Sequence, residues 1–211
     1  MKKIRAVIFD MDGVLIDAKE WHYEALNKAL ALFGYNITRE EHLTVYDGLP
    51  TKVKLQSLTE QKGLPKALHK LINEMKQQYT AAMILQYCRP RFNHEFALAR
   101  LKSEGYKIAV CSNSIRSTIE LMMEKAALAP YLVFTVSNED VKKAKPDPEI
   151  YNNAITRLGL SPDEVLVVED NKNGIQAALA AGANLLKVET VDDVNYYAIK
   201  NRIKELEEEK A

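Results

Sequence analysis

The chain has 211 residues, of which 47% are hydrophobic, so it can bury a full core in one or two domains. Its 29 basic and 29 acidic residues balance, so the chain has no net charge whose electrostatic field would attract nucleic acid or an anionic membrane. The apolar runs are no longer than strands and the amino terminus has no signal-peptide pattern, so we expect a cytoplasmic protein with no membrane partner, for which a monomer is plausible.

The first predicted element is a strand over residues 4–9, which is apolar and rich in β-branched residues, as a buried parallel strand is. It leads directly into Asp10, Asp12 and Gly13. Carboxylates are seldom buried unless they are paired or bound to a metal, and ligands of open α/β sheets lie at the carboxyl ends of strands. Asp-x-Asp-Gly is also a common turn sequence, so this motif alone does not decide between a turn and a site.

Residues 18–86 contain no convincing strand. Apolar residues recur there at helical spacing and predict three helices, of which the first ends at Gly34 and the second at Gly63. Pro65 fits the first turn of the third helix, whose apolar face runs from Leu68 to Tyr79. We therefore expect a helical insertion over 18–86, with the main domain formed by residues 1–17 and 87–211.

Strands and helices alternate in the rest of the chain. The predicted strands are 106–111, 133–136, 164–168 and 183–188, and the predicted helices are 96–105, 115–123, 149–158, 175–181 and 194–210. This order indicates right-handed βαβ units and a parallel sheet covered on both faces. The expected fold class is α/β, with a Rossmann-like sheet and an inserted helical unit.

Polar residues also lie at three later places in the chain: after the strand 106–111, just before the helix 149–158, and after the strand 164–168. Ser112, Asn113 and Ser114 can cap a helix or hold a phosphate at its N-terminus. Lys145 precedes Pro146, and is either a solvated loop residue or a positioned cation. The last pair, Glu169 and Asp170, ends a buried strand and is hard to explain without a cation.

These residue types are the ones that phosphoryl transfer needs. A phosphate monoester is dianionic near neutral pH, so a carboxylate can attack it only where positive charge offsets the repulsion. Mg²⁺ prefers oxygen ligands and commonly takes one or two carboxylates together with a substrate phosphate. The sequence thus predicts a site for Mg²⁺ and a phosphorylated metabolite.

Four segments resemble, in order and spacing, the four motifs of the haloacid dehalogenase superfamily, in the branch of β-phosphoglucomutase and the sugar-phosphate phosphatases. The segments are 10–17, 112–113, 145–146 and 169–178. The resemblance implies that the helical insertion is a cap, that Asp10 is a nucleophile forming an aspartyl-phosphate, and that Asp12 is a general acid and base. It also implies Mg²⁺ held by Asp10, the main chain of Asp12 and Asp170, with Glu169 orienting these ligands. Ser112, the main chain of Asn113 and Lys145 would hold the phosphoryl oxygens, and Lys145 would also pair with Asp10.

Some positions depart from the mutase pattern. Ala18 stands where those relatives have a hydroxyl residue, and Thr51 stands where they have a cap-loop arginine, with Lys52 beside it. His22 matches a cap histidine of the mutases, although a lone histidine near a helix start is also a common surface or hinge residue. We therefore expect a Mg²⁺-dependent phosphatase of small phosphorylated metabolites, with sugar phosphates as substrates. One alternative is a hexose-phosphate mutase. The other is a phospho-aspartate receiver domain, but a receiver domain would need neither the insertion nor Asp12.

Overall fold

A five-stranded parallel sheet forms the centre of the protein, whose computed structural model describes residues 3–209. Its strands are β1 (Ala6–Phe9), β2 (Lys107–Cys111), β3 (Phe134–Val136), β4 (Val165–Glu169) and β5 (Asn184–Lys187), in the order β3-β2-β1-β4-β5. Every pairing is parallel, which confirms the predicted α/β class. The central strand β1 is buried along its whole length.

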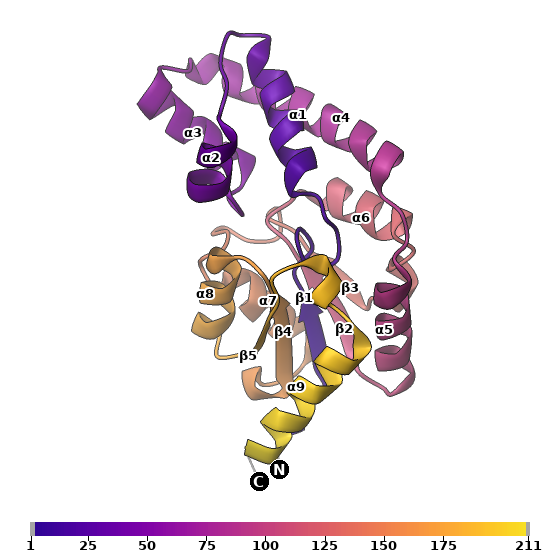
Figure 1. Ribbon diagram of the computed structural model, residues 1–211. Helices are drawn as coiled ribbons and strands as arrows, with labels where there is room; N and C mark the ends of the chain where they lie inside the picture. Colours follow the sequence, from indigo (N-terminus) through magenta and orange to yellow (C-terminus); the bar gives the residue numbers. More distant parts are fainter. Residues whose placement is uncertain (1–2, 210–211) are drawn as a thin grey trace.

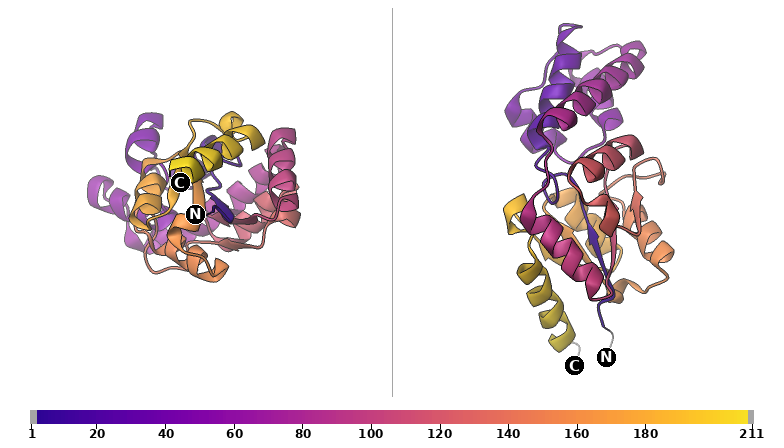
Figure 2. Two further views of the ribbon diagram at one scale, coloured as in Figure 1. Left: turned by 90° about the horizontal axis from the view of Figure 1, so that it is seen from below. Right: turned by 90° about the vertical axis from the view of Figure 1, so that its right-hand side faces the viewer.

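Helices cover both faces of this sheet because side chains alternate along each buried strand. Val7 and Phe9 of β1 belong to one apolar cluster, together with α5 (Phe92–Ser103), α6 (Arg116–Lys125) and α9 (Tyr196–Glu209). Ala6 and Ile8 face the opposite side and pack with α7 (Glu149–Leu158) and α8 (Lys172–Ala180). Figure 2 shows α5 and α9 on one side of the sheet and α7 on the other.

A group of helices lies beyond the carboxyl ends of the strands (Figure 1). It consists of α1 (Lys19–Ala31), α2 (Arg39–Glu41), α3 (Thr51–Lys62) and α4 (His69–Tyr87), with a short turn η2 (Lys66–Leu68) before α4. Helices α1, α3 and α4 share a third apolar cluster, whose fully buried members include Leu30, Leu58 and Ile72. We call this helical group the cap; its chain boundaries at 18 and 86 stay a prediction.

Most predicted elements of the chain are present, with differences at their ends. Neither α2 nor the π-helix η1 (His42–Tyr46) that continues it was predicted, because this segment has no sustained apolar period. The helix predicted from residue 175 begins at Lys172, because the Asn171 side chain accepts the N–H of Asn173 and caps it. The end of the last predicted helix, Lys210, lies outside the described residues.

Within residues 3–209, no helix combines the length and the apolar composition that a bilayer-crossing span requires.

The remaining short 3₁₀ turns, which connect the longer elements, are η3 (Ala129–Tyr131), η4 (Pro162–Glu164) and η5 (Val191–Asp193).

Candidate active site

The pairing of the central strands brings the first and the last acidic motifs to one level of the sheet. Phe9, the last residue of β1, lies opposite Val110 of β2 and Val168 of β4. Asp10 follows Phe9 and continues the ladder, since its N–H donates to the Val168 carbonyl at 3.0 Å. Asp10 therefore lies level with Glu169, as expected for two motifs that each follow a parallel strand.

Lys145 is buried between these two carboxylates, with 4% of its surface exposed. Its Nζ donates to Asp10 Oδ1 at 2.6 Å, to Glu169 Oε1 at 2.7 Å and to the Cys111 carbonyl at 2.8 Å. Burial alone would lower the pKa of this amine, but the charges of Asp10 and Glu169 raise it above the usual range. Lys145 is therefore a fixed positive charge, rather than a solvated loop lysine.

Protein donors occupy both carboxylate oxygens of Glu169. The Tyr151 hydroxyl donates to Oε1 at 2.6 Å, and the N–H groups of Asp170 and Asn171 lie 3.2 and 3.3 Å from Oε2. Gly174 packs against the same carboxylate so closely that a Cβ there would lie 1.7 Å from Oε1. Glu169 is thus held rigidly. The role of Tyr151 was not predicted, because its helical position looks like ordinary core.

A divalent cation fits between Asp10 and Asp170. Carboxylate oxygens of Asp10, Glu169 and Asp170 lie within 4.8 Å of one another, and those of Glu169 are already occupied. The Asp170 side chain is 1% exposed, and its Oδ1 has no hydrogen-bond partner among the described residues. Burial and neighbouring carboxylates raise the pKa of Asp10 well above its usual value, although Lys145 opposes this. A cation would offset this excess of negative charge.

The loop after β1 closes tightly against the same site. Gly13 has a φ of +91°, and a Cβ there would lie 2.2 Å from Asp170 Oδ2. Lys19, the first residue of α1, places its Nζ 2.8 Å from that oxygen and 3.8 Å from Asp47 Oδ2. A cation on Asp170 would compete with Lys19, a residue that lies outside the four sequence motifs.

Asp12 lies on the cavity side of this loop and is held by the cap. Its Oδ1 is 3.0 Å from His22 Nε2, and its Oδ2 accepts from the Ser114 hydroxyl at 3.2 Å. Lys76 donates to His22 Nδ1 at 3.1 Å, so the imidazole proton lies on Nε2 and points to Asp12. Burial would raise the pKa of Asp12, but His22, Lys76 and Ser114 lower it overall. Asp12 is therefore ionised.

Ser112 and Asn113 follow β2 at the floor of the cavity. The Ser112 hydroxyl accepts the N–H of Ser114 at 3.0 Å, but α6 begins only at Arg116, so the helix-cap interpretation of Ser112 is wrong. Asn113 Oδ1 accepts the Lys145 N–H at 3.1 Å, and its Nδ2 donates to the carbonyl of Gly48 in the cap at 2.8 Å. Asn113 therefore connects Lys145 with the cap.

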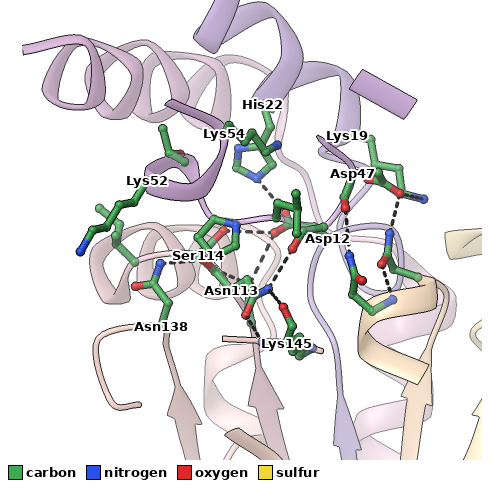
Figure 3. Close-up of a pocket in the computed structure, with 18 of the residues that line it drawn as sticks. Asp12, Lys19, His22, Asp47, Lys52, Lys54, Asn113, Ser114, Asn138 and Lys145 are labelled. Atoms are coloured by element: carbon green, nitrogen blue, oxygen red, sulfur yellow. Dashed lines mark hydrogen bonds and ion pairs between the residues drawn. The ribbon is translucent and has the colours of Figure 1, made fainter. Parts of the chain in front are cut away.

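A cavity of about 170 Å³ lies between the cap and these residues (Figure 3). This volume is below the roughly 300–1,000 Å³ of pockets for drug-sized ligands, so the space suits a small molecule. The loop at Asp47 seals one side: Asn171 Nδ2 donates to Asp47 Oδ2 at 2.6 Å, and Asn173 Nδ2 to the Asp47 carbonyl at 3.3 Å. His42 and Lys54 line the cavity from the cap.

Comparison with known proteins agrees with this geometry. The sequence profile of the haloacid dehalogenase-like hydrolases matches residues 7–188, which include all four polar motifs. A phosphorylated carbohydrates phosphatase from Thermotoga maritima is 31% identical over 182 residues, covering 85% of this chain and 82% of that protein. The structure of β-phosphoglucomutase from Clostridium difficile has a TM-score of 0.84 at 23% identity, covering 96% of this chain and 98% of that one. CbbY from Rhodobacter sphaeroides, in complex with phosphate, has a TM-score of 0.80 at 23% identity, covering 87% and 85%.

Proposed function

The chain belongs to the haloacid dehalogenase-like hydrolase family, and from that premise we propose that it is a Mg²⁺-dependent phosphatase of small phosphorylated carbohydrates. The observation that carries this proposal is the buried contact of Lys145 with Asp10, beside Asp170 and below the cavity that Asp12 lines. The Thermotoga maritima relative, whose name states that it acts on phosphorylated carbohydrates, supports the substrate class.

In the first half of the reaction, an Asp10 carboxylate oxygen attacks the phosphorus atom of the substrate. The bond from phosphorus to the sugar oxygen breaks, and that oxygen takes a proton from Asp12, which must therefore be protonated when substrate is bound. The ammonium of Lys145, fixed at 2.6 Å from Asp10, offsets repulsion between the carboxylate and the phosphoryl oxygens. Ser112 and the main chain of Asn113 hold those oxygens.

In the second half, water attacks the aspartyl-phosphate and the bond from phosphorus to Asp10 breaks. Asp12 accepts the proton of the attacking water; its lowered pKa and its contact with His22 keep the carboxylate ionised, and so available as a base, before the water arrives. Mg²⁺ bound by Asp10 and Asp170, with the Asp12 carbonyl, would neutralise charge on the phosphoryl group. Glu169 positions Lys145 and does not itself touch the phosphoryl group.

The assay that tests the function follows free phosphate and glucose 6-phosphate together, starting from β-glucose 1-phosphate with a trace of glucose bisphosphate. We expect phosphate release to be faster, and a chelator to stop it reversibly. A mutase must grip a second phosphate firmly and exclude water while the intermediate turns round. This cap has Ala18 and Thr51 where the mutases have a hydroxyl and a bidentate arginine, so a lysine of the cap would hold a second anion only as a point charge. Faster appearance of glucose 6-phosphate would assign the chain as a mutase instead.

Replacing Asp12 with Asn should damage proton transfer and leave Mg²⁺ affinity unchanged. The amide oxygen still accepts the His22 hydrogen bond and the main-chain carbonyl remains, so the local geometry is kept. We expect kcat for sugar phosphates to fall about 10²- to 10⁴-fold, the usual contribution of general acid–base catalysis. The loss should be smaller for p-nitrophenyl phosphate, whose leaving group needs no proton. An equal loss for both substrates would argue against this role of Asp12, provided that phosphorylation of Asp10 limits the rate.

A further inference from the structure

Two buried polar side chains on the cap side of the cavity have no hydrogen bond or ion pair with another side chain in 3–209. Lys54 of α3 is 7% exposed, and its ammonium has no hydrogen bond or ion pair with any residue in 3–209. His42 of η1 is 2% exposed, and neither of its ring nitrogens makes a hydrogen bond to a side chain within the same range. Both line the cavity that contains Asp10 and Asp12. Buried polar groups are normally paired, so these two call for a ligand.

The other lysines of the cavity do not share this feature. Lys52 is exposed, so water solvates its charge. The buried or half-buried ones each have a side-chain partner: Lys19 contacts Asp170, Lys76 donates to His22, and Lys145 contacts Asp10 and Glu169. Lys54 is therefore the lysine of this cavity that is both desolvated and unpaired.

Lys54 faces the reacting groups across the cavity. Figure 3 shows Lys54 beside His22 on the cap side, with Asp12, Asn113 and Lys145 on the side of the sheet. The charges of Asp47 and Asp12 reach Lys54 and raise its pKa, but burial has the larger effect and lowers it to about 8. Burial also lowers the pKa of His42 to about 4, so its ring is neutral near pH 7 and offers one N–H donor.

We propose that Lys54, with His42 beside it, binds a second anionic group of the substrate, at the end away from the phosphoryl group that is removed. The preferred substrate is then a phosphorylated carbohydrate that also carries a carboxylate or a second phosphate. This inference rests on the proposed phosphatase activity, in which Ser112, Asn113 and Lys145 hold the transferred group.

An anion fits this position better than a neutral hydroxyl does. A desolvated ammonium gains most from a charged acceptor, because charge-assisted hydrogen bonds are about twice as strong as neutral ones. A neutral sugar end would leave the charge of Lys54 uncompensated inside the cavity. The same contact would also favour closure of the cap over substrates that carry the second anion.

The test compares kcat/KM for two matched pairs of substrates with the wild-type protein and Mg²⁺. One pair is 6-phosphogluconate and sorbitol 6-phosphate, which differ in a terminal carboxylate. The other is fructose 1,6-bisphosphate and fructose 6-phosphate, which differ in a second phosphate. We expect at least one anionic member to be preferred by about tenfold to a hundredfold, the value of a hydrogen bond to a charged group. The pair that shows the preference identifies the anion.

Lys54→Met keeps the length of the side chain and removes the charge, and Lys52→Met is the matched control on the exposed neighbour. Lys54→Met should abolish the preference, mainly through KM for the anionic member, and should change the neutral member less than threefold. Lys54→Arg should restore part of the preference. Equal kcat/KM within both wild-type pairs, or a preference that survives in Lys54→Met, would overturn the inference while phosphate release upheld the phosphatase. Absence of phosphate release from all four substrates and from p-nitrophenyl phosphate would instead reject the proposed function.

Discussion

Asp10→Asn is expected to lower the rate of phosphate release by roughly 10³-fold or more, because an amide does not attack phosphorus and no longer supplies an anionic metal ligand. The fold should be at least as stable as that of the wild type. Burial and Glu169 raise the pKa of Asp10, which means that the ionised carboxylate is held in an unfavourable place. A neutral amide of the same shape removes that cost and still accepts from Lys145.

The measurement is phosphate release at saturating Mg²⁺, together with thermal unfolding of both proteins. Acid-quenched wild type should contain a phosphorylated form, and the variant should contain none. Asp17→Asn is the matched control, since Asp17 is an exposed carboxylate at the end of the same loop. If Asp10→Asn kept a tenth of the wild-type rate, the covalent mechanism would be abandoned.

Gly174→Ala should destabilise the protein by about 3–5 kcal/mol, although alanine is normally the better helix residue by about 1 kcal/mol. The new Cβ would lie 1.7 Å from Glu169 Oε1 and 2.4 Å from Oε2. Glu169 cannot retreat without losing Lys145, Tyr151 or the two N–H donors at the end of β4. The substitution therefore breaks a buried ion pair rather than shifting a flexible side chain.

Thermal unfolding measures this effect, and for a chain of this size the expected loss corresponds to a fall in Tm of roughly 6–20 °C. Gln176→Ala, at an exposed position of the same helix, is the control and should change stability by less than about 0.5 kcal/mol. A variant at Gly174 that unfolds within two degrees of the wild type would show that Glu169 is not held rigidly.

The arrangement of Asp10, Glu169 and Asp170 was predictable from the sequence because parallel strands bring their carboxyl ends to one edge. Each motif follows a strand, and the end of the apolar run in the sequence marks the carboxyl end of that strand. A residue just after such a run can therefore be placed at the carboxyl edge of the sheet. The pairing of Lys145 with Asp10 was also expected from the resemblance. Both predictions depend on regular elements, whose periods can be read in the sequence.

The contacts between the cap and the sheet were not predictable in this way. The contacts of Lys19 with Asp170 and of Asp47 with Asn171 join segments that are far apart in the chain, and neither leaves a periodic signal. His42 was missed because it lies in a π-helix, where the helical spacing changes. One signal was available: Lys76 lies four residues from both Ile72 and Thr80, on the buried stripe of α4, where a solvated lysine is unexpected.

The separate apolar cluster beneath α1, α3 and α4 has a consequence for how this protein can evolve. His42 and Lys54, to which we assign recognition of the substrate, belong to a segment that packs on this cluster. Asp10, Lys145 and Glu169 depend instead on the two clusters that cover the sheet. Mutations in the segment 42–54 can therefore change which metabolite is accepted while the reacting groups keep their geometry. A lineage can thus acquire new substrates by small steps, each of which leaves phosphoryl chemistry intact.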